Sequence, residues 1–186
     1  MNIITNTKEI SKFNKNIYCE SPIYISSNKF WDGGITCDSS LEEKSSFYDI
    51  AKKMSYITKD IILELNESIF IGKTFCENNE IYAHWSDLKK HEFFRTISQT
   101  ISPKKHYKLT LPNDCNIIDL IIESNFRYFS YISLYFPKNN IICLPTCHTE
   151  LLIYTQKPTE IIRILQPIIC KYSNEDYKII YNPIIH

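Results

Sequence analysis

Apolar residues occupy almost every second position between residues 126 and 136. The apolar positions are Phe126, Tyr128, Ile132, Leu134 and Phe136. Ser130 is the one polar residue on this period of two. Such alternation is typical of a β-strand with one buried face. We therefore predict a strand over residues 126–136.

A hairpin and a helix are predicted to follow this strand. Residues 137–140 (PKNN) have the composition of a turn. Apolar runs at residues 141–144 and 149–155 then predict two more strands. Residues 158–160 (PTE) are a typical helix start, and Pro167 is predicted to end that helix because proline lacks the N–H that a helix interior needs.

The first half of the chain contains the pattern of a long helix. Residues 39–43 (SSLEE) contain a capping-box signature, in which serine caps the helix and glutamate lies three residues on. Apolar residues then recur at helical spacing as far as Ile69, and Gly72 is predicted to be the C-terminal cap. The pattern predicts one long helix, or two helices broken near Thr58.

The remaining segments complete an α+β protein. An edge strand over residues 17–25 would tolerate Pro22. Weaker patterns predict helices over residues 86–101 and 117–123, and strands over residues 107–111 and 177–181. We predict a single α+β domain over residues 1–186, with helices mainly in the first half and a largely antiparallel sheet in the second half.

Composition excludes several classes of protein. A chain of 186 residues, 44% of them hydrophobic, is long enough to bury a core without disulfides or metals. Three glycines are too few for the glycine-rich loops that hold phosphates or dinucleotides. The formal net charge is zero, whereas a dedicated nucleic-acid binder normally has a basic excess. We therefore expect no nucleic-acid partner.

The cysteines and the N-terminus predict a cytoplasmic protein. Seven cysteines are an odd number, and they are dispersed along the chain, so reduced thiols are the simplest interpretation. The first residues lack the basic region and apolar run of a signal peptide. No apolar run approaches the length of a membrane span, so we expect no membrane association.

Acidic residues are concentrated in one segment of this neutral chain. They are Asp32, Asp38, Glu42, Glu43 and Asp49. Lys44 is the only basic residue among them, which leaves four net negative charges. Trp31 immediately precedes the segment, so an aromatic anchor and acidic side chains are expected to share one surface. Such a surface suits a basic partner, although an acidic run can also be an ordinary solvated face.

A second aromatic candidate is Trp85. It lies in residues 82–87 (YAHWSD), a mixture of aromatic and polar side chains that is enriched at the energetic centres of protein interfaces. The alternative is a tryptophan packed at the start of a helix that Ser86 or Asp87 caps.

The most concentrated set of reactive side chains is Cys143, Cys147 and His148. Thiolates and imidazole are zinc ligands, and a fourth ligand could be Glu150, Cys115 or Cys170. A cysteine nucleophile would need a base, for which His84 and His91 are candidates. Yet the two cysteines have a Cys-x-x-x-Cys spacing that a proline interrupts, rather than paired Cys-x-x-Cys motifs. We therefore predict no metal, no cofactor and no catalytic residue, and keep a small cysteine- and histidine-dependent enzyme or a zinc-binding protein as the alternative.

The second half of the chain resembles the C-terminal part of small bacterial immunity proteins. The resemblance covers roughly residues 126–170. Its elements are a strand (YISLYF, 131–136), a turn, the segment CLPTCH (143–148), a strand over 149–154 and the helix start PTEIIR (158–163). Immunity proteins accompany polymorphic toxins, including those of contact-dependent growth inhibition systems.

This resemblance implies a cytoplasmic protein that binds one cognate toxin domain and covers its active site. It implies no catalysis and no cofactor, and it transfers no site residues, because immunity proteins of this kind share none. Combined with the acidic segment, it predicts a partner-binding surface made of Trp31, Asp32, Asp38, Glu42, Glu43 and Trp85. A regulatory module that binds another protein is the remaining alternative.

Overall fold

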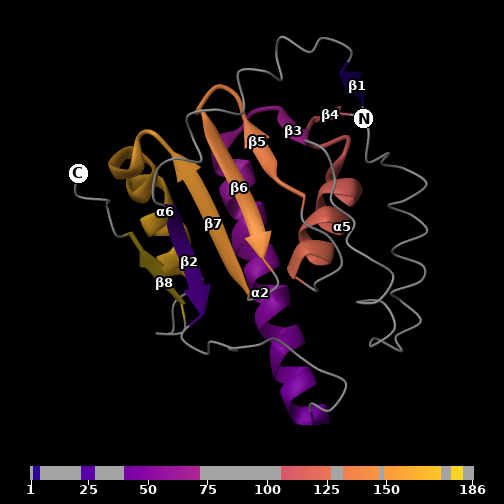
Figure 1. The fold of residues 1–186 in the computed structure, drawn as a ribbon, viewed down its shortest axis with the longest axis vertical. Helices are drawn as coiled ribbons and strands as arrows, with labels where there is room; N and C mark the ends of the chain where they lie inside the picture. Colours follow the sequence, from indigo (N-terminus) through magenta and orange to yellow (C-terminus); the bar gives the residue numbers. More distant parts are fainter. Residues whose placement is uncertain are drawn as a thin grey trace.

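The structure is a computed structural model that describes residues 2–4, 22–27, 40–71, 106–126, 132–146, 149–172 and 177–181. Within these ranges it has eight strands and three helices (Figure 1). The strands are β1 (Asn2–Ile4), β2 (Ile23–Ser27), β3 (Ile69–Ile71), β4 (His106–Leu109), β5 (Leu134–Phe136), β6 (Ile141–Thr146), β7 (Glu150–Thr155) and β8 (Tyr177–Ile180). The helices are α2 (Leu41–Leu65), α5 (Cys115–Phe126) and α6 (Pro158–Tyr172). The helix predicted at residues 86–101 lies outside the described residues.

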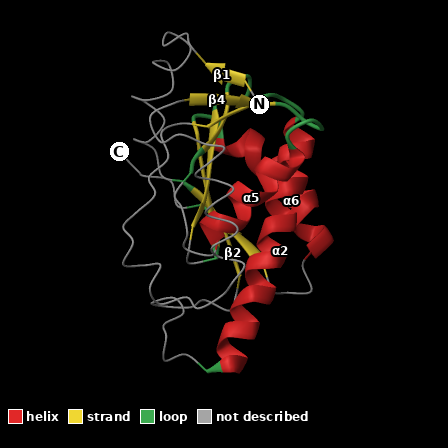
Figure 2. Cartoon of the chain, turned by 90° about the vertical axis from the view of Figure 1, so that its right-hand side faces the viewer, coloured by secondary structure: helices red, strands yellow, loops and turns green. Residues whose placement is uncertain are grey.

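The strands form one sheet in the order β1-β4-β3-β5-β6-β7-β2-β8. Every neighbouring pair in this order is antiparallel. Figure 2 shows α2, α5 and α6 together on one face of the sheet. The predicted α+β class and its antiparallel sheet are therefore confirmed.

The prediction that β2 is an edge strand is wrong. β2 begins at Ile23 and pairs with β7 on one side and with β8 on the other. Pro22 comes just before the strand, so its missing N–H removes no bond from either ladder. Ile23 and Ile25 are fully buried, which explains why the segment occupies the interior of the sheet.

The long helix α2 begins where the sequence predicts and ends earlier. The Ser40 side chain accepts from Glu43 N at 3.1 Å, and the Glu43 carboxylate accepts from Ser40 N at 2.7 Å, which completes the capping box. The helix continues unbroken through Thr58, whose hydroxyl donates to the Met54 carbonyl. The predicted cap at Gly72 is wrong, because Asn66 ends the helix.

Asn66 ends α2 in a left-handed conformation. Its φ is 43° and its N–H donates to the Ile62 carbonyl at 3.2 Å. Asparagine tolerates this conformation better than most residues. Ile69 fits the helical spacing by coincidence and belongs to β3. The chain therefore changes from helix to strand within three residues.

The strand predicted over residues 126–136 is wrong at its first residue. Phe126 is the last residue of α5, and Leu134–Phe136 forms the strand β5, while residues 127–131 lie outside the described residues. Asn125 connects the two elements, since its Nδ2 donates to Ile132 O at 2.8 Å and its Oδ1 accepts from Ile132 N at 3.0 Å. The alternation of apolar residues in the sequence therefore spans the end of α5. The buried Asn125 side chain bonds this helix end to Ile132, which precedes β5.

The hairpins of the second half are close to their prediction. Residues 137–140 form the turn between β5 and β6, and β7 follows antiparallel to β6. The carboxylate of Glu67, which is buried, accepts from Lys138 N at 2.7 Å and from Asn139 N at 3.2 Å. This glutamate anchors the turn to the segment between α2 and β3.

Pro167 does not end α6 as predicted. The helix runs from Pro158 to Tyr172 with Pro167 inside it. Pro167 and Arg163, four residues before it, are both exposed, so water can solvate the carbonyl that the proline leaves without a donor. Burial of Leu165 and Ile169 on the opposite side holds the last turns against the core.

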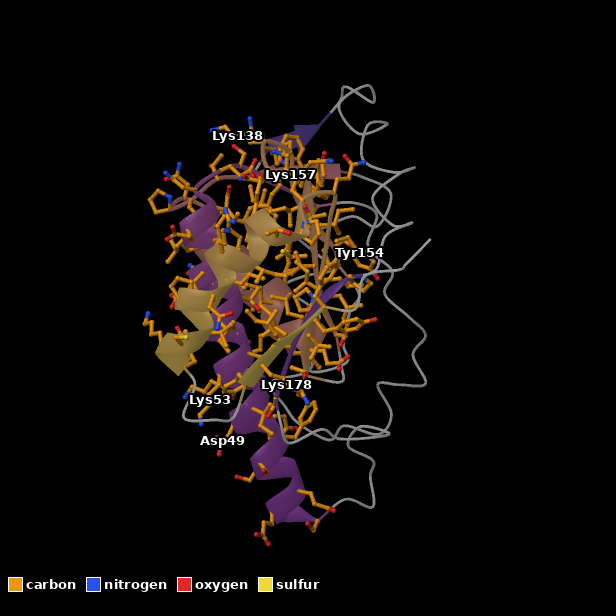
Figure 3. All side chains as sticks on the ribbon, turned by 90° about the vertical axis from the view of Figure 1, so that its left-hand side faces the viewer. Asp49, Lys53, Lys138, Tyr154, Lys157 and Lys178 are labelled. Carbon is orange, nitrogen blue, oxygen red and sulfur yellow. The ribbon has the colours of Figure 1, made fainter. Side chains whose placement is uncertain are left out.

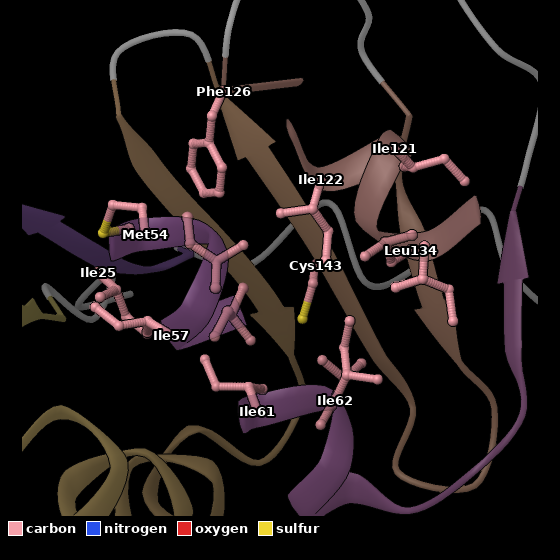
Figure 4. Packing of buried hydrophobic residues seen from close by; sticks show 14 of the residues in the cluster. Ile25, Met54, Ile57, Ile61, Ile62, Ile121, Ile122, Phe126, Leu134 and Cys143 are labelled. Atoms are coloured by element: carbon pink, nitrogen blue, oxygen red, sulfur yellow. The ribbon is translucent and has the colours of Figure 1, made fainter. Parts of the chain in front are cut away.

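The main core lies between the sheet and the helices. Ile57, Ile61 and Ile62 of α2 pack there with residues of α5, α6 and the strands. Figure 4 shows Cys143 of β6 in this cluster, near Ile62 and Ile122. Because α2 contacts both α5 and α6, it is the central helix of the layer.

Candidate functional site

Two of the six predicted partner-binding residues lie in the described part of the chain. Glu42 and Glu43 are exposed in the first turn of α2. Glu43 already serves the capping box, whereas Glu42 makes no hydrogen bond or ion pair with any described residue. The predicted residues Trp31, Asp32, Asp38 and Trp85 lie outside the described residues.

Cys143 is not a candidate for a reactive or metal-binding thiol in the structure. Its side chain is buried in the apolar core, and this burial raises the pKa of the thiol far above neutrality. Cys143 is therefore a neutral core residue and not a thiolate. Cys147 and His148 lie outside the described residues.

The proposed additional zinc ligands do not converge on Cys143. Cys143 pairs with Ile153, and Glu150 lies three positions before Ile153 on β7, so the two side chains project from opposite faces of the sheet. Cys170 is exposed on the outer side of α6. Among the described residues, no group of three histidine, cysteine or acidic side chains could hold a metal ion.

A hollow of about 380 Å³ lies between α2 and α5. We call it the α2–α5 hollow, and its lining residues are Tyr48, Asp49, Ala51, Lys52, Ser55, Tyr56, Lys59, Asp119, Ile122 and Glu123. Ala51 and Ser55, one helical turn apart, have small side chains and leave space at its base. The Ser55 hydroxyl donates to the Ala51 carbonyl at 2.9 Å, which turns the side chain back onto the helix.

The sides of the α2–α5 hollow are aromatic and charged. Tyr56 is 45% exposed, and it is one of two large hydrophobic side chains exposed among the described residues. The lining has three carboxylates and two ammonium groups, so its net charge is one negative. Lys59 Nζ lies 2.6 Å from Asp119 Oδ2, which joins the two helices across one end.

Asp49 links this hollow to the predicted acidic segment. It is exposed on α2, two turns before Tyr56 and on the same side of the helix. Figure 3 shows Asp49 pointing away from the sheet. Figure 1 shows that the first turns of α2 extend beyond the ends of β6 and β7. The acidic turns of α2 and the hollow therefore form one continuous side of the molecule.

A polar cluster fixes α2 against α6 on its other side. Lys171 Nζ and the Tyr172 hydroxyl each lie 2.7 Å from Asp60 Oδ2. Burial alone would raise the pKa of Asp60, but these hydrogen bonds and the charge of Lys171 outweigh it and lower the pKa below its ordinary value. The cluster is structural, because its carboxylate is used by two donors of the same chain.

Sequence reasoning missed the α2–α5 hollow. Asp119 and Glu123 are four residues apart in the predicted short helix, and Tyr48 and Ser55 are seven residues apart in the long one, so each set could have been assigned to one helix side. That the two sides face each other depends on the packing of α2 against α5. The residue pattern of one sequence does not reveal how two helices pack against each other.

No family model, no curated protein and no solved structure matches this chain. Within the described residues, none of the helices is both long enough and apolar enough to cross a membrane.

Proposed function

We propose that this protein is an immunity protein that binds a cognate bacterial toxin domain and neutralises it by covering the active site. The observation that carries the proposal is the continuous side formed by the acidic first turns of α2 and the α2–α5 hollow. The layout of the sequence over residues 126–170, which resembles that of immunity proteins, supports it. Such a protein works in the bacterial cytoplasm and needs no metal, cofactor, membrane or nucleic acid.

The charge distribution supports occlusion of a basic surface. A toxin that cleaves nucleic acid presents a basic groove to its substrate, and the exposed carboxylates of Glu42 and Asp49 would be attracted to it. Charge attraction accelerates association, whereas desolvated aromatic side chains slow dissociation. Tyr56, exposed two helical turns from Asp49 on the same side of α2, supplies such an aromatic side chain.

Rigid presentation of α2 also supports the proposal. The capping box fixes its first turn, the ion pair with Asp119 fixes it to α5, and the Asp60 cluster fixes it to α6. A preformed helix surface loses little conformational entropy when a partner binds.

The decisive experiment is binding of the purified protein to the product of the adjacent gene. We expect co-purification of the two proteins and inhibition of the toxin's activity at equimolar amounts. Complete absence of binding would refute immunity against that partner.

Stopped-flow association at two salt concentrations tests the acidic surface. The double variant Glu42→Gln and Asp49→Asn should associate more slowly than the wild type, and its rate should depend less on salt. Glu43 is left unchanged because it belongs to the capping box. Glu64→Gln, an exposed change at the other end of α2, is the matched control. An association rate equal to that of the control would refute the role of the acidic turns.

A further inference from the structure

We infer that a hollow at the C-terminal end of α2 binds a small organic acid that carries one carboxylate on an apolar body. We call it the β3–β4 hollow, and its lining residues are Asn66, Glu67, Ser68, Phe70, Lys108, Thr110, Leu111, Pro137 and Lys138. Among the described residues, it has none in common with the α2–α5 hollow. The inference therefore goes beyond the proposed function and does not depend on it.

The β3–β4 hollow lies where three segments of the chain meet. Residues 66–70 lead from α2 into β3, residues 108–111 come from the end of β4, and residues 137–138 belong to the turn between β5 and β6. Its volume is about 390 Å³, which is within the range of small-molecule sites. β3 pairs with both β4 and β5, so the three segments are held together before a ligand binds.

Two lysines make the described lining positive. Lys108 and Lys138 each contribute an ammonium group, and neither group forms an ion pair or a hydrogen bond with a described residue. Lys108 Nζ instead lies 5.7 Å from the centre of the Phe70 ring. Glu67 is the one carboxylate among the described lining residues, so their net charge is one positive.

The carboxylate of Glu67 is already used by the turn between β5 and β6. Its Oε2 accepts from Lys138 N at 2.7 Å, and its Oε1 accepts from Asn139 N at 3.2 Å and from Asn139 Nδ2 at 2.7 Å. Three N–H donors therefore occupy this carboxylate, and it pairs with neither ammonium group. An anionic ligand would be the ion-pair partner that the described part of the chain does not supply.

The net charge favours one carboxylate over a phosphate monoester. A single carboxylate would bring the described lining to neutrality. A phosphate monoester carries about two negative charges at neutral pH and would leave an excess of negative charge. The carbonyl groups at the end of α2 contribute about half a further negative charge, which also disfavours a second charge on the ligand.

The apolar part of the lining favours an acid with an apolar body. Phe70, Leu111 and Pro137 provide aromatic and aliphatic surface beside the lysines. Because Lys108 Nζ lies over the Phe70 ring, an acid whose body contacts this ring has its carboxylate next to an ammonium group. Apolar walls with a few polar groups that fix the orientation of the ligand are typical of small-molecule sites.

Phenylacetate and phenylacetamide test the hollow as a pair of probes with nearly the same shape and different charge. Each probe is titrated into the isotope-labelled full chain. We expect phenylacetate to shift the backbone amide signals of residues 66–70, 108–111 and 138–139, and to bind roughly threefold or more tighter than phenylacetamide. Added salt should weaken the binding of phenylacetate and leave that of phenylacetamide nearly unchanged. Equal affinity for the two probes, or no shift in these segments, would overturn the inference.

A third probe, phenyl phosphate, tests the number of charges. We expect it to bind no tighter than phenylacetate, because its second charge has no partner in the described lining. Tighter binding of phenyl phosphate would overturn the assignment of a carboxylate.

Lysine variants test which groups hold the carboxylate. Lys108→Met and Lys138→Met keep an apolar stem and remove the charge, and each should weaken the binding of phenylacetate by roughly threefold without changing that of phenylacetamide. Lys178→Met is the control, because Lys178 is an exposed lysine of β8 that Figure 3 shows well away from Lys138. Circular dichroism shows whether each variant is folded, and if Lys108→Met does not fold, Lys138→Met decides. Equal losses in Lys178→Met and the two hollow variants would overturn the site.

The proposed function and this inference fail independently. Absence of binding to the adjacent gene product refutes immunity against that partner and leaves the titrations of the β3–β4 hollow unaffected. Failure of the titrations removes the organic-acid site and leaves the proposed function standing.

Discussion

Asn125 provides both hydrogen bonds that a neighbouring strand would otherwise give to the backbone of Ile132. These are the bond from Asn125 Nδ2 to Ile132 O at 2.8 Å and the bond from Ile132 N to Asn125 Oδ1 at 3.0 Å. Both residues are 0% exposed, so water cannot replace either bond. Asn125→Leu nearly conserves the volume and removes both partners. Each buried backbone group left without a partner costs about 1–3 kcal/mol, so the free energy of unfolding should fall by about 2–6 kcal/mol.

Asn125→Asp tests the loss of the hydrogen-bond donor separately from the loss of the acceptor. The aspartate keeps an oxygen for the Ile132 N–H but, when ionised, has no donor for the Ile132 carbonyl. Burial raises the pKa of such a carboxyl in the folded state above its unfolded value of about 3.9. Above that pH the folded state binds more protons than the unfolded state, so the stability of this variant falls as the pH rises. At mildly acidic pH the protonated carboxyl donates to Ile132 O again, and the variant should approach the wild type.

Urea unfolding followed by circular dichroism measures both effects, at neutral and at mildly acidic pH. Asn116→Leu makes the same chemical change at an exposed position of the same helix and is the control. If Asn125→Leu unfolds at the same urea concentration as this control, the two hydrogen bonds do not stabilise the fold as argued. If the deficit of Asn125→Asp relative to the wild type does not shrink on acidification, the missing donor is not its cause.

Three further predictions concern thiols, the end of α2 and acid stability. In the native protein, Cys170 should react quickly with a thiol reagent, whereas Cys143 should react only after unfolding, because burial keeps its thiol protonated. Mass spectrometry measures the labelling of each cysteine, and fast labelling of Cys143 in the native protein would contradict this prediction. Asn66→Ala should lower the free energy of unfolding by about 1 kcal/mol, because alanine disfavours a φ of 43°. Asn66→Gly should leave the free energy of unfolding nearly unchanged. Equal urea midpoints for the two variants would show that the left-handed conformation at this position does not affect stability. Asp60 has a lowered pKa in the folded state, so its contribution to stability is complete above the ordinary pKa of 3.8 and is lost as the pH falls through the lower folded pKa. The difference in stability between the wild type and Asp60→Asn should therefore shrink on acidification. A difference that does not depend on pH would refute the contribution of the ionised Asp60 carboxylate.

Local signals in the sequence predicted the elements that depend on neighbouring residues alone. The capping box within residues 39–43 is readable because its two partners are three residues apart, and the structure shows that these partners are Ser40 and Glu43. The turn at residues 137–140 is readable for the same reason, since its composition determines it. The prediction failed where two periods overlap. Ile69 continues the helical spacing of α2 although it belongs to a strand, and Phe126 continues the spacing of β5 although it ends a helix.

Properties set by packing between distant elements could not be predicted in this way. The position of β2 between β7 and β8 depends on pairings across more than 120 residues of sequence. The acidic segment was predicted from charge counts, and Glu42 and Glu43 are indeed exposed on α2. The α2–α5 hollow, however, exists because small residues at Ala51 and Ser55 face α5. Their size is visible in the sequence, but the helix opposite them is not.

One side of α2 packs in the core, and the other side is the one that we propose binds the partner. Ile57 and Ile61 are buried in the core, whereas Asp49 and Tyr56 are exposed on the other side of the same helix. Substitutions on the exposed side leave the buried contacts in place and should cost little stability. Under the proposed function, a change of partner would therefore need changes only at exposed residues of α2 and α5, while the sheet and the core remain the same. This separation also makes the proposed function testable, because loss of toxin binding in a variant such as Tyr56→Ala can be distinguished from loss of folding.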